Sequence, residues 1–429
     1  MAKLSDLVSP QTFEAWMDEL WSYPRSLTGV GVTQTLAWIQ KQIGTLDIHA
    51  EATGSQVMDW QVPPVWEVEH ATLHDPSGRC VADWSRRRIE LVGYSEPFQG
   101  QLSLDDLQRH LYSLPDQPNA IPYVTSYYAP RWGFCVSQKV RDSLTEGLYT
   151  VDIRSRLVPG VMQWGEWVLP GETTDEVLLS TYICHPDMAN NELSGPMVCT
   201  ALAQWLKTRP RKKTYRMVFL PETIGSLAFL AKRLPHMKQH LKAGYVVTCV
   251  GDNRAWGLVP SRTGGAADRM AHAQLQDDGV AYTHWSWMDR GSDERQYCAP
   301  GVDLPVASVV RSRYGTYPEY HTSLDDRTLV TGSNLVESTA FYTRLLDRID
   351  QADFPQSAVL GEPQMGRRGL YPTLSAKGSA TGVRATMDIL SLCDGRTEDT
   401  EITRLSGSTP EKVAETLALL RAHGVVVPI

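Results

Sequence analysis

Two histidines and three acidic residues each come after a run of apolar residues that is typical of a buried strand. His185 and Asp187 follow "EVLLSTYIC", and Glu222 follows "YRMVFLP". Asp252 follows "YVVTCVG", and His321 lies in "YPEYHTSLDD", after the run "PVASVV". A single such residue is usually a cap or a loop anchor. Together they predict a site for a zinc-type ion, which prefers imidazole nitrogen and carboxylate oxygen ligands.

The segment "STYICHPDMANNELSGP" contains two further candidates, Asn191 and Glu192. A neutral amide at Asn191 offers a metal ion no charge. Asp187 or Glu192 could supply a carboxylate oxygen to the metal ion in place of Asn191. In the alternative reading, Glu192 caps the following helix and Asp187 makes a turn.

Strand-like and helix-like patterns alternate from about 165 to 350, after two amphipathic helices within 10–46. Strands that are apolar on both faces and separated by helices indicate an α/β fold with a mainly parallel sheet covered on both sides. Ligands of such sheets bind beyond the carboxyl ends of the strands. This is where the candidate metal ligands are expected.

Between 57 and 155 the sequence consists mostly of short strand-like segments, and we expect this stretch to form an inserted, mostly β domain. It would interrupt a main domain formed by 1–56 and 156–352. Strands are predicted at "WEVEHATLHD", "RRIELVGYS" and "TSYYAPRWGFCVS", with a short helix near "SLDDLQRHLYSL". The Trp and Tyr residues of this part could cover the site, although core packing is the alternative.

Residues 360–429 are predicted to form a winged helix, with three short helices and a final strand at "VVVPI". Thr409 is a plausible N-cap, and Pro410 stands at the first helical position. From Gly382 onward the chain has five Lys/Arg and seven Asp/Glu. This balance favours a packing or protein-contact role over DNA binding. A homo-oligomer could form through this domain or the inserted one.

The composition narrows the class of protein. The net charge of -8 and the 42% hydrophobic content are those of a globular protein that is not a general nucleic-acid binder. We expect no signal peptide, and no apolar run approaches the roughly 20 residues that span a bilayer. Seven scattered cysteines without a CxxC pair indicate reduced thiols and a cytoplasmic location.

Three motifs, "ICHPDMANNELSGP", "PETIGS" and "RGSDERQY…YPEYHTSLDD", resemble a known fold. From about 165 to 345 the chain is similar to zinc aminopeptidases of the bacterial leucyl aminopeptidase and glutaminyl cyclase type. It resembles more closely a bacterial group of aminopeptidase-like proteins with an inserted β domain and a C-terminal winged helix. The resemblance therefore covers nearly the whole chain.

The resemblance implies a role for each matching residue. His185, Asp252 and His321 match metal ligands, and Glu222 matches the general base that activates water. Asn191 stands where the dinuclear enzymes have a bridging carboxylate, and Thr223 replaces a second carboxylate ligand. Because two divalent ions need that negative charge, we expect one zinc per chain rather than two. Asp325 or Asp326 could orient the second ring nitrogen of His321.

The remaining candidates are polar residues that could contact the substrate. Acidic side chains could bind a free amino group, and arginines, including Arg295 and Arg311, could bind a carboxylate or phosphate. The predicted substrate-binding residues are Asn191, Asp293, Glu294, Arg290, Glu319 and Tyr320.

The predicted function is a zinc-dependent amide or peptide hydrolase of aminopeptidase type, acting on a small peptide or aminoacyl conjugate. Two alternatives stay open at this point. One is an acyl-transferring or cyclising enzyme on the same one-zinc scaffold. The other is a non-catalytic binding or regulatory protein with a decayed metal site.

Overall fold

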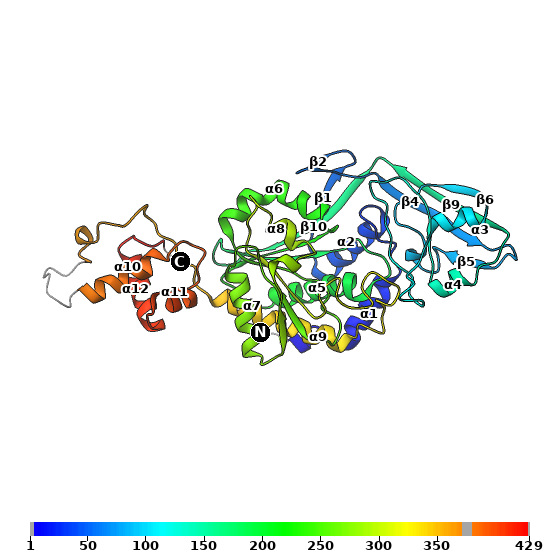
Figure 1. The fold of residues 1–429 in the computed structure, drawn as a ribbon. Helices are drawn as coiled ribbons and strands as arrows, with labels where there is room; N and C mark the ends of the chain where they lie inside the picture. Colours follow the sequence, from blue (N-terminus) through cyan, green and yellow to red (C-terminus); the bar gives the residue numbers. More distant parts are fainter. Residues whose placement is uncertain (1–3, 371–379, 428–429) are drawn as a thin grey trace.

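The computed structural model describes residues 4–370 and 380–427, which form three parts in a row (Figure 1). A central α/β body lies between a small β unit at one end and a C-terminal helical unit at the other. No helix in the described ranges is long and apolar enough to cross a membrane. All seven cysteines lie in these ranges, and none forms a disulfide.

The body is built on a mixed sheet that has eight strands within the described residues. Its strands, in spatial order, are β1 (Asp47–Ala52), β10 (Val161–Leu169), β12 (Thr214–Leu220), β11 (Glu176–Tyr182), β13 (Leu241–Val246), β16 (Val306–Val310), β14 (Trp256–Val259) and β15 (Tyr282–His284). The central strands β12, β11, β13 and β16 run parallel, whereas β10 and β14 pair antiparallel with their inner neighbours. The predicted α/β fold is confirmed, and its parallel part is the centre of the sheet.

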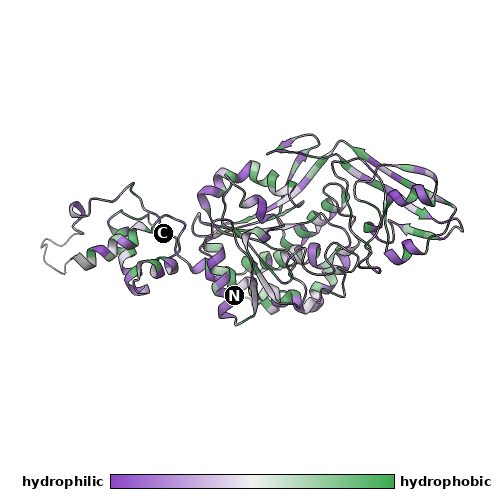
Figure 2. Ribbon diagram, viewed as in Figure 1, coloured by the Kyte–Doolittle hydropathy of each residue, from purple (hydrophilic) through white to green (hydrophobic). Residues whose placement is uncertain are grey.

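Helices cover both faces of this sheet, and the central strands are therefore buried along their whole length. One face packs against α1 (Pro10–Trp21), α2 (Val30–Ile43), α5 (Ser194–Lys207), α7 (Ala266–Asp277) and α9 (Gly332–Gln351). The other face packs against α6 (Ile224–His240) and α8 (Glu294–Tyr297). Figure 2 shows hydrophobic and hydrophilic residues alternating along these helices, as expected when one side of a helix faces a core.

The inserted unit has a four-stranded antiparallel sheet of β5 (Cys80–Asp83), β4 (Val65–His74), β9 (Leu148–Val158) and β6 (Phe98–Ser103). Its smaller elements are the hairpin β2 (Gln56–Val57) and β3 (Trp60–Gln61), the pair β7 (Leu111–Tyr112) and β8 (Phe134–Cys135), and the helices η2 (Arg88–Glu90), α3 (Leu104–Leu107), η3 (Gln108–His110) and α4 (Gln138–Asp142).

Two strand predictions in this unit are wrong. The segment "RRIELVGYS" forms the short helix η2 and a loop, and "TSYYAPRWGFCVS" forms a loop that ends in the two-residue strand β8. The physical reason is that the loop around 121–126 makes its backbone hydrogen bonds with other loops. For example, the Tyr123 amide donates to the His321 carbonyl at 2.8 Å, and the Ser126 amide donates to the Gly93 carbonyl at 2.9 Å.

The C-terminal unit contains the three predicted helices, α10 (Ala380–Ser391), α11 (Asp399–Ser406) and α12 (Pro410–Ala422). Thr409 caps α12 as predicted, because its hydroxyl accepts a hydrogen bond from the Lys412 amide. The predicted strand "VVVPI" is reduced, in its described part, to an isolated bridge between Ser357 and Val426. Residues 428–429 lie outside the described residues. The remaining short helices are η1 (Leu4–Asp6), η4 (Ala189–Leu193), η5 (Trp287–Asp289) and η6 (Gly366–Arg368).

Candidate functional site

The loops at the carboxyl ends of the parallel strands have an unusual backbone conformation. Among the residues that the structure describes, seven other than glycine have a positive φ, and four of these lie in these loops. The four are Asp187, Thr223, Cys249 and His321, with φ between 51° and 65°. Such a conformation is rare outside glycine, above all for a β-branched residue such as Thr223. Strain of this kind concentrates at functional sites.

A pair of histidines stands at this edge of the sheet. The ring centroids of His185 and His321 are 5.3 Å apart. The Nε2 atom of His185 lies 3.6 Å from the Glu222 carboxylate, and the buried Nε2 atom of His321 has no hydrogen-bond partner among the described residues. Burial lowers the pKa of each histidine to about 3, so that both rings are neutral and keep a nitrogen lone pair.

The other ring nitrogen of His185 is held by Glu192. The Nδ1 atom of His185 is 2.8 Å from the Glu192 carboxylate, which lies 3.7 Å from the buried guanidinium of Arg25. Arg25 also donates a hydrogen bond to the His185 carbonyl at 2.9 Å. Burial raises the pKa of Glu192 well above its usual range, against the opposing charge of Arg25. Glu192 therefore orients His185 from beside Arg25, a position different from the predicted direct contact with a metal ion.

Cys184, His185 and Glu192 place three potential ligand atoms within 4.8 Å of one another. Two observations indicate a hydrogen-bonded cluster rather than a metal site. The Cys184 sulfur already accepts a hydrogen bond from the Glu222 amide at 3.2 Å, and the Arg25 cation repels a second cation. The open side of His185 is its Nε2 atom, which faces Glu222.

Glu222 and Asp293 form a pair of neighbouring carboxylates. Burial, followed by the charge of Asp293, raises the pKa of Glu222 to about 8, against the opposing effect of Arg295. Asp293 accepts hydrogen bonds from the Thr223 amide at 2.7 Å and from the Ser226 hydroxyl at 3.0 Å. Asp293 therefore supports the strained turn at Thr223 beside the predicted base.

Asp252 and Asn191, predicted as a metal ligand and a substrate contact, face other protein groups. Both oxygens of the fully buried Asp252 are engaged, one by the Asn190 side chain at 2.7 Å and one by the Arg254 amide at 2.8 Å. The Asn191 side-chain oxygen accepts a hydrogen bond from Tyr182 at 3.1 Å. Both residues hold the loops that carry the histidines.

Two further aspartates that were predicted to act at the metal site contact other groups of the chain. Asp187, predicted as a ligand, accepts a hydrogen bond from the Ile89 amide of the inserted unit at 3.1 Å. Asp325 accepts hydrogen bonds from the Asn190 and Asn191 amides at 2.6 and 2.9 Å, instead of orienting the ring of His321. The alternative, Asp326, bonds to Thr328.

Three of the predicted substrate contacts also have other partners. Glu294 is fully buried and accepts hydrogen bonds from the Gly291 and Ser292 amides at 2.8 and 3.1 Å, so it supports its own loop. Glu319 pairs with Arg254 at 2.9 Å. Arg290 lies over the ring of Trp287, 4.9 Å from its centre. Tyr320, by contrast, stacks directly on His321 with a centroid distance of 3.9 Å.

Tyr123 belongs to the site, although the sequence did not single it out. Its ring meets His185 edge-on at 5.3 Å and His321 at 5.4 Å, and its backbone amide binds the His321 carbonyl. The available signal was the aromatic content of the inserted segment. No spacing rule connects Tyr123 with histidines far away in the chain.

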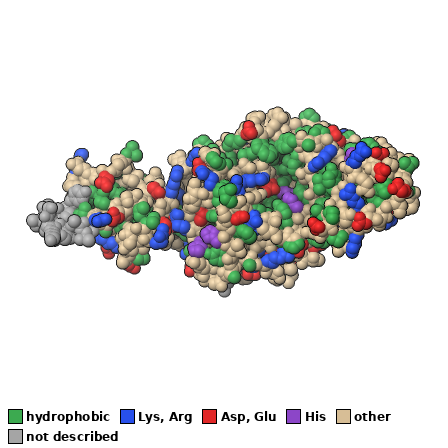
Figure 3. All heavy atoms as spheres, in the orientation of Figure 1, with side chains coloured by type: hydrophobic (Ala, Val, Ile, Leu, Met, Phe, Trp, Pro, Cys, Tyr) green, Lys and Arg blue, Asp and Glu red, His purple; other side chains and the backbone are tan. Residues whose placement is uncertain are grey.

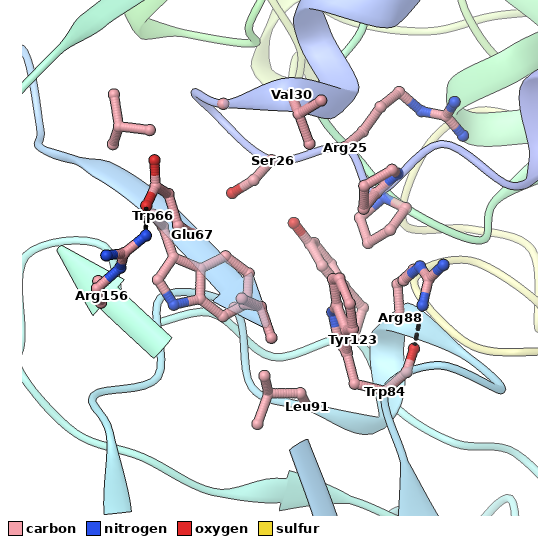
Figure 4. Close-up of a pocket in the computed structure, with 16 residues that line it drawn as sticks. Arg25, Ser26, Val30, Trp66, Glu67, Trp84, Arg88, Leu91, Tyr123 and Arg156 are labelled. Carbon is pink, nitrogen blue, oxygen red and sulfur yellow. Dashed lines mark hydrogen bonds and ion pairs between the residues drawn. The ribbon is translucent and has the colours of Figure 1, made fainter. Parts of the chain in front are cut away.

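A cavity of about 370 Å³ adjoins the histidine pair (Figure 4). Pro186, the residue after His185, lines it, as does Tyr123. The hydroxyl groups of Ser26 and Tyr123 point into the cavity, and the indole of Trp66 forms the facing wall. The cavity therefore offers a flat aromatic surface and hydroxyl groups next to the loop that carries His185.

Comparisons with known proteins show the family and the fold of the chain. A family described as "Domain of unknown function (DUF4910)" matches residues 14–352, and a winged helix-turn-helix family matches residues 354–428. A Clostridium acetobutylicum protein, whose name suggests polysaccharide biosynthesis and an aminopeptidase-like domain, is 35% identical over 91% of this chain and 90% of its own length.

Two solved structures are similar to the chain. The crystal structure of a Clostridium acetobutylicum protein with a suggested peptidase role has a TM-score of 0.79 and 32% identity, and the match covers 98% of this chain and 96% of that one. The zinc aminopeptidase BSAP from Bacillus subtilis has a TM-score of 0.56 and 11% identity, over 80% of this chain and 95% of that one. The second match shows the fold alone.

Proposed function

Because the chain belongs to the DUF4910 family and has an aminopeptidase-like fold, we propose that it is a metal-dependent amide hydrolase. The observation that carries the proposal is the pair of neutral histidines, His185 and His321, with an open Nε2 face next to Glu222. The substrate class we propose is a small peptide or an aminoacyl conjugate.

The side chains at the histidine pair suit one zinc ion better than two. Two neutral imidazoles beside a carboxylate suit one ion. Two ions about 3.5–4 Å apart need a bridging carboxylate, whereas Asn191 is neutral and faces Tyr182. The residues present therefore support one ion, held by the Nε2 atoms of His185 and His321, and do not suit a second.

Each residue of the site has a chemical task in this proposal. A bound zinc ion supplies Lewis acidity, which acidifies water and polarises a carbonyl group. Glu222, whose carboxylate lies 3.6 Å from the Nε2 atom of His185, would take a proton from the attacking water and give it to the leaving amine. The positive charge of a bound ion would lower the raised pKa of Glu222 and favour the carboxylate form that this role needs. Tyr123 and Tyr320 pack against the imidazoles and exclude bulk water.

The cavity beside the histidines is the proposed place for one end of the substrate. Its aromatic wall, Trp66, and its hydroxyl groups suit a ring that has both an apolar face and polar substituents. The name of the Clostridium acetobutylicum relative suggests polysaccharide biosynthesis, which supports an aminoacyl group attached to a sugar.

A variant comparison tests the proposal. The purified protein is loaded with zinc and assayed on aminoacyl-anilides, short peptides and aminoacyl-amino sugars. We expect measurable amide cleavage and a loss of about 10²–10⁴-fold in kcat for Glu222→Gln, the range typical of a general base. The control is Glu415→Gln, on the exposed surface of α12, which keeps full activity. Equal rates in the two variants, or no cleavage of any of these substrates, contradict the proposal.

A further inference from the structure

A second cavity, of about 280 Å³, lies at the same edge of the sheet, beside the loop that leads to His321. Three arginines line it together with two tryptophans. They are Arg254, Arg311, Arg313, Trp256 and Trp285. None of these residues takes part in the proposed hydrolysis, so the concentration of positive charge needs another explanation.

Each arginine is stacked on an aromatic ring. The guanidinium of Arg311 lies 4.2 Å from the centre of Trp256, and that of Arg313 lies 4.3 Å from the centre of Trp285. Arg254 is 6.0 Å from the centre of Tyr317. Stacking fixes the plane of a guanidinium and leaves its edges, which carry the N–H groups, for hydrogen bonds to a ligand.

The charges around this cavity do not cancel. Arg254 pairs with Glu319 at 2.9 Å, and Arg311 pairs with Glu337 at 2.6 Å. Arg313 has no carboxylate within 4 Å in the part of the chain that the structure describes. It donates one hydrogen bond, to the Asp289 carbonyl at 2.6 Å. One positive charge therefore remains without an anionic partner.

The Nε–H groups of two arginines in this cluster also lack an acceptor. The Nε atoms of Arg311 and Arg313 are buried, and neither has a hydrogen-bond partner among the described residues. Arg311 as a whole is only 7% exposed, so water reaches it poorly. A buried donor without an acceptor costs about 1–3 kcal/mol, and an anionic ligand would recover this free energy.

The cavity is close in the fold to the histidine site. Arg254 comes just before β14, and Arg311 comes just after β16; because these strands are antiparallel, both arginines lie at one edge of the sheet. Arg254 follows Asp252 by two residues, and its partner Glu319 precedes His321 by two. A ligand in this cavity would therefore rest against the loop that carries His321.

We infer that this cavity is a binding site for an anionic group, a phosphate or a carboxylate, of a small ligand. The planar fork of a guanidinium matches both groups, and several guanidinium groups around one small cavity distinguish an anion from a neutral ligand. The inference concerns binding alone, and it stands independently of the proposed hydrolysis.

Calorimetric titration of the full chain tests the inference at constant ionic strength. Inorganic phosphate and pyrophosphate form one arm, and acetate and succinate form the other, with sodium chloride as the reference. We expect saturable one-site binding in at least one arm and a Kd at least tenfold higher for Arg313→Gln. Arg313→Lys keeps the charge but loses the fork, so its Kd falls between those of the wild type and Arg313→Gln.

The matched control is Arg209→Gln, because Arg209 is also stacked on a tryptophan, Trp205 at 4.4 Å, and paired with an acid, Asp347 at 2.6 Å. It removes the same charge outside the cavity and leaves the Kd unchanged. Circular dichroism verifies that each variant is folded. Absence of saturable binding in both arms overturns the inference, and so does an equal loss of affinity in Arg209→Gln and Arg313→Gln.

Discussion

The inserted unit and the C-terminal winged helix both pack on the central body, but at different ends of its strands. The inserted unit reaches the carboxyl ends, where Tyr123 contacts both histidines and the Ile89 amide binds Asp187. The winged helix is held near the beginning of β13, where Lys242 donates a hydrogen bond to the Gly395 carbonyl at 2.6 Å. The inserted unit is therefore part of the site, whereas the winged helix contacts the body at the opposite ends of the parallel strands.

The two junctions also differ in chemistry. Aromatic rings and backbone hydrogen bonds join the inserted unit to the site, whereas charged residues join the winged helix to the body. Arg269 of α7 donates two hydrogen bonds, from Nε and Nη2, to the two carboxylate oxygens of Glu398. Figure 3 shows lysine and arginine side chains near this junction. Changes in the inserted unit should thus affect catalysis, and changes in the tail should affect stability.

The largest effect, on the free energy of unfolding, is expected for Glu192→Gln inside the site. This substitution leaves Arg25 as a buried charge without its partner, which costs about 3–5 kcal/mol in the free energy of unfolding. Urea denaturation measures the change. The control is Glu319→Gln, whose partner Arg254 is partly exposed, and we expect a loss of about 1 kcal/mol or less there. Equal losses in the two variants would contradict the role of Glu192.

An intermediate effect, on kcat/KM, is expected for Tyr123→Ala in the inserted unit. Loss of the ring lets both imidazoles shift, and small misplacements of reacting groups cost up to about 10²-fold in rate. We expect kcat/KM to fall by about 10–100-fold while zinc stays bound, measured by steady-state kinetics and metal analysis. Tyr128→Ala, in the same segment but 55% exposed, should keep full activity. Full activity in Tyr123→Ala would show that the inserted unit does not take part in the site.

The smallest effect on activity is expected for Glu398→Gln in the tail. Arg269 loses a two-point ion pair, so the free energy of unfolding should fall by about 2 kcal/mol while kcat/KM stays unchanged. Thermal unfolding and steady-state kinetics measure the two quantities on the same sample. A tenfold loss of activity would show that the tail reaches the catalytic edge after all.

The sequence predicted the fold well, because its signals are local. Continuous apolar runs predicted the central strands, and the Thr409-Pro410 pair predicted the start of α12. The failed strand at "TSYYAPRWGFCVS" has a non-local cause. Its Tyr and Trp residues have strand propensity, but its backbone bonds to another loop, as the Ser126 amide does to the Gly93 carbonyl.

The candidate site was predictable in position but less so in its contacts. Residues after parallel strands must meet at one edge of the sheet, which brought His185, Glu222 and His321 together as expected. Which atom each side chain faces depends on partners far along the chain. The Glu192 carboxylate contacts the Nδ1 atom of His185 and lies near the Arg25 guanidinium. Asp252 accepts a hydrogen bond from the Asn190 side chain. Neither partner can be recognised by its spacing.

We propose that His185 and His321 together hold one divalent ion, and zinc analysis of three proteins tests this proposal. Wild type, His185→Gln and His321→Gln are dialysed against a trace of zinc, and the metal per folded chain is measured by mass spectrometry. We expect close to one zinc per chain in the wild type and a marked loss in both variants. Two zinc ions per chain, no zinc at all, or unchanged binding in either variant would contradict it.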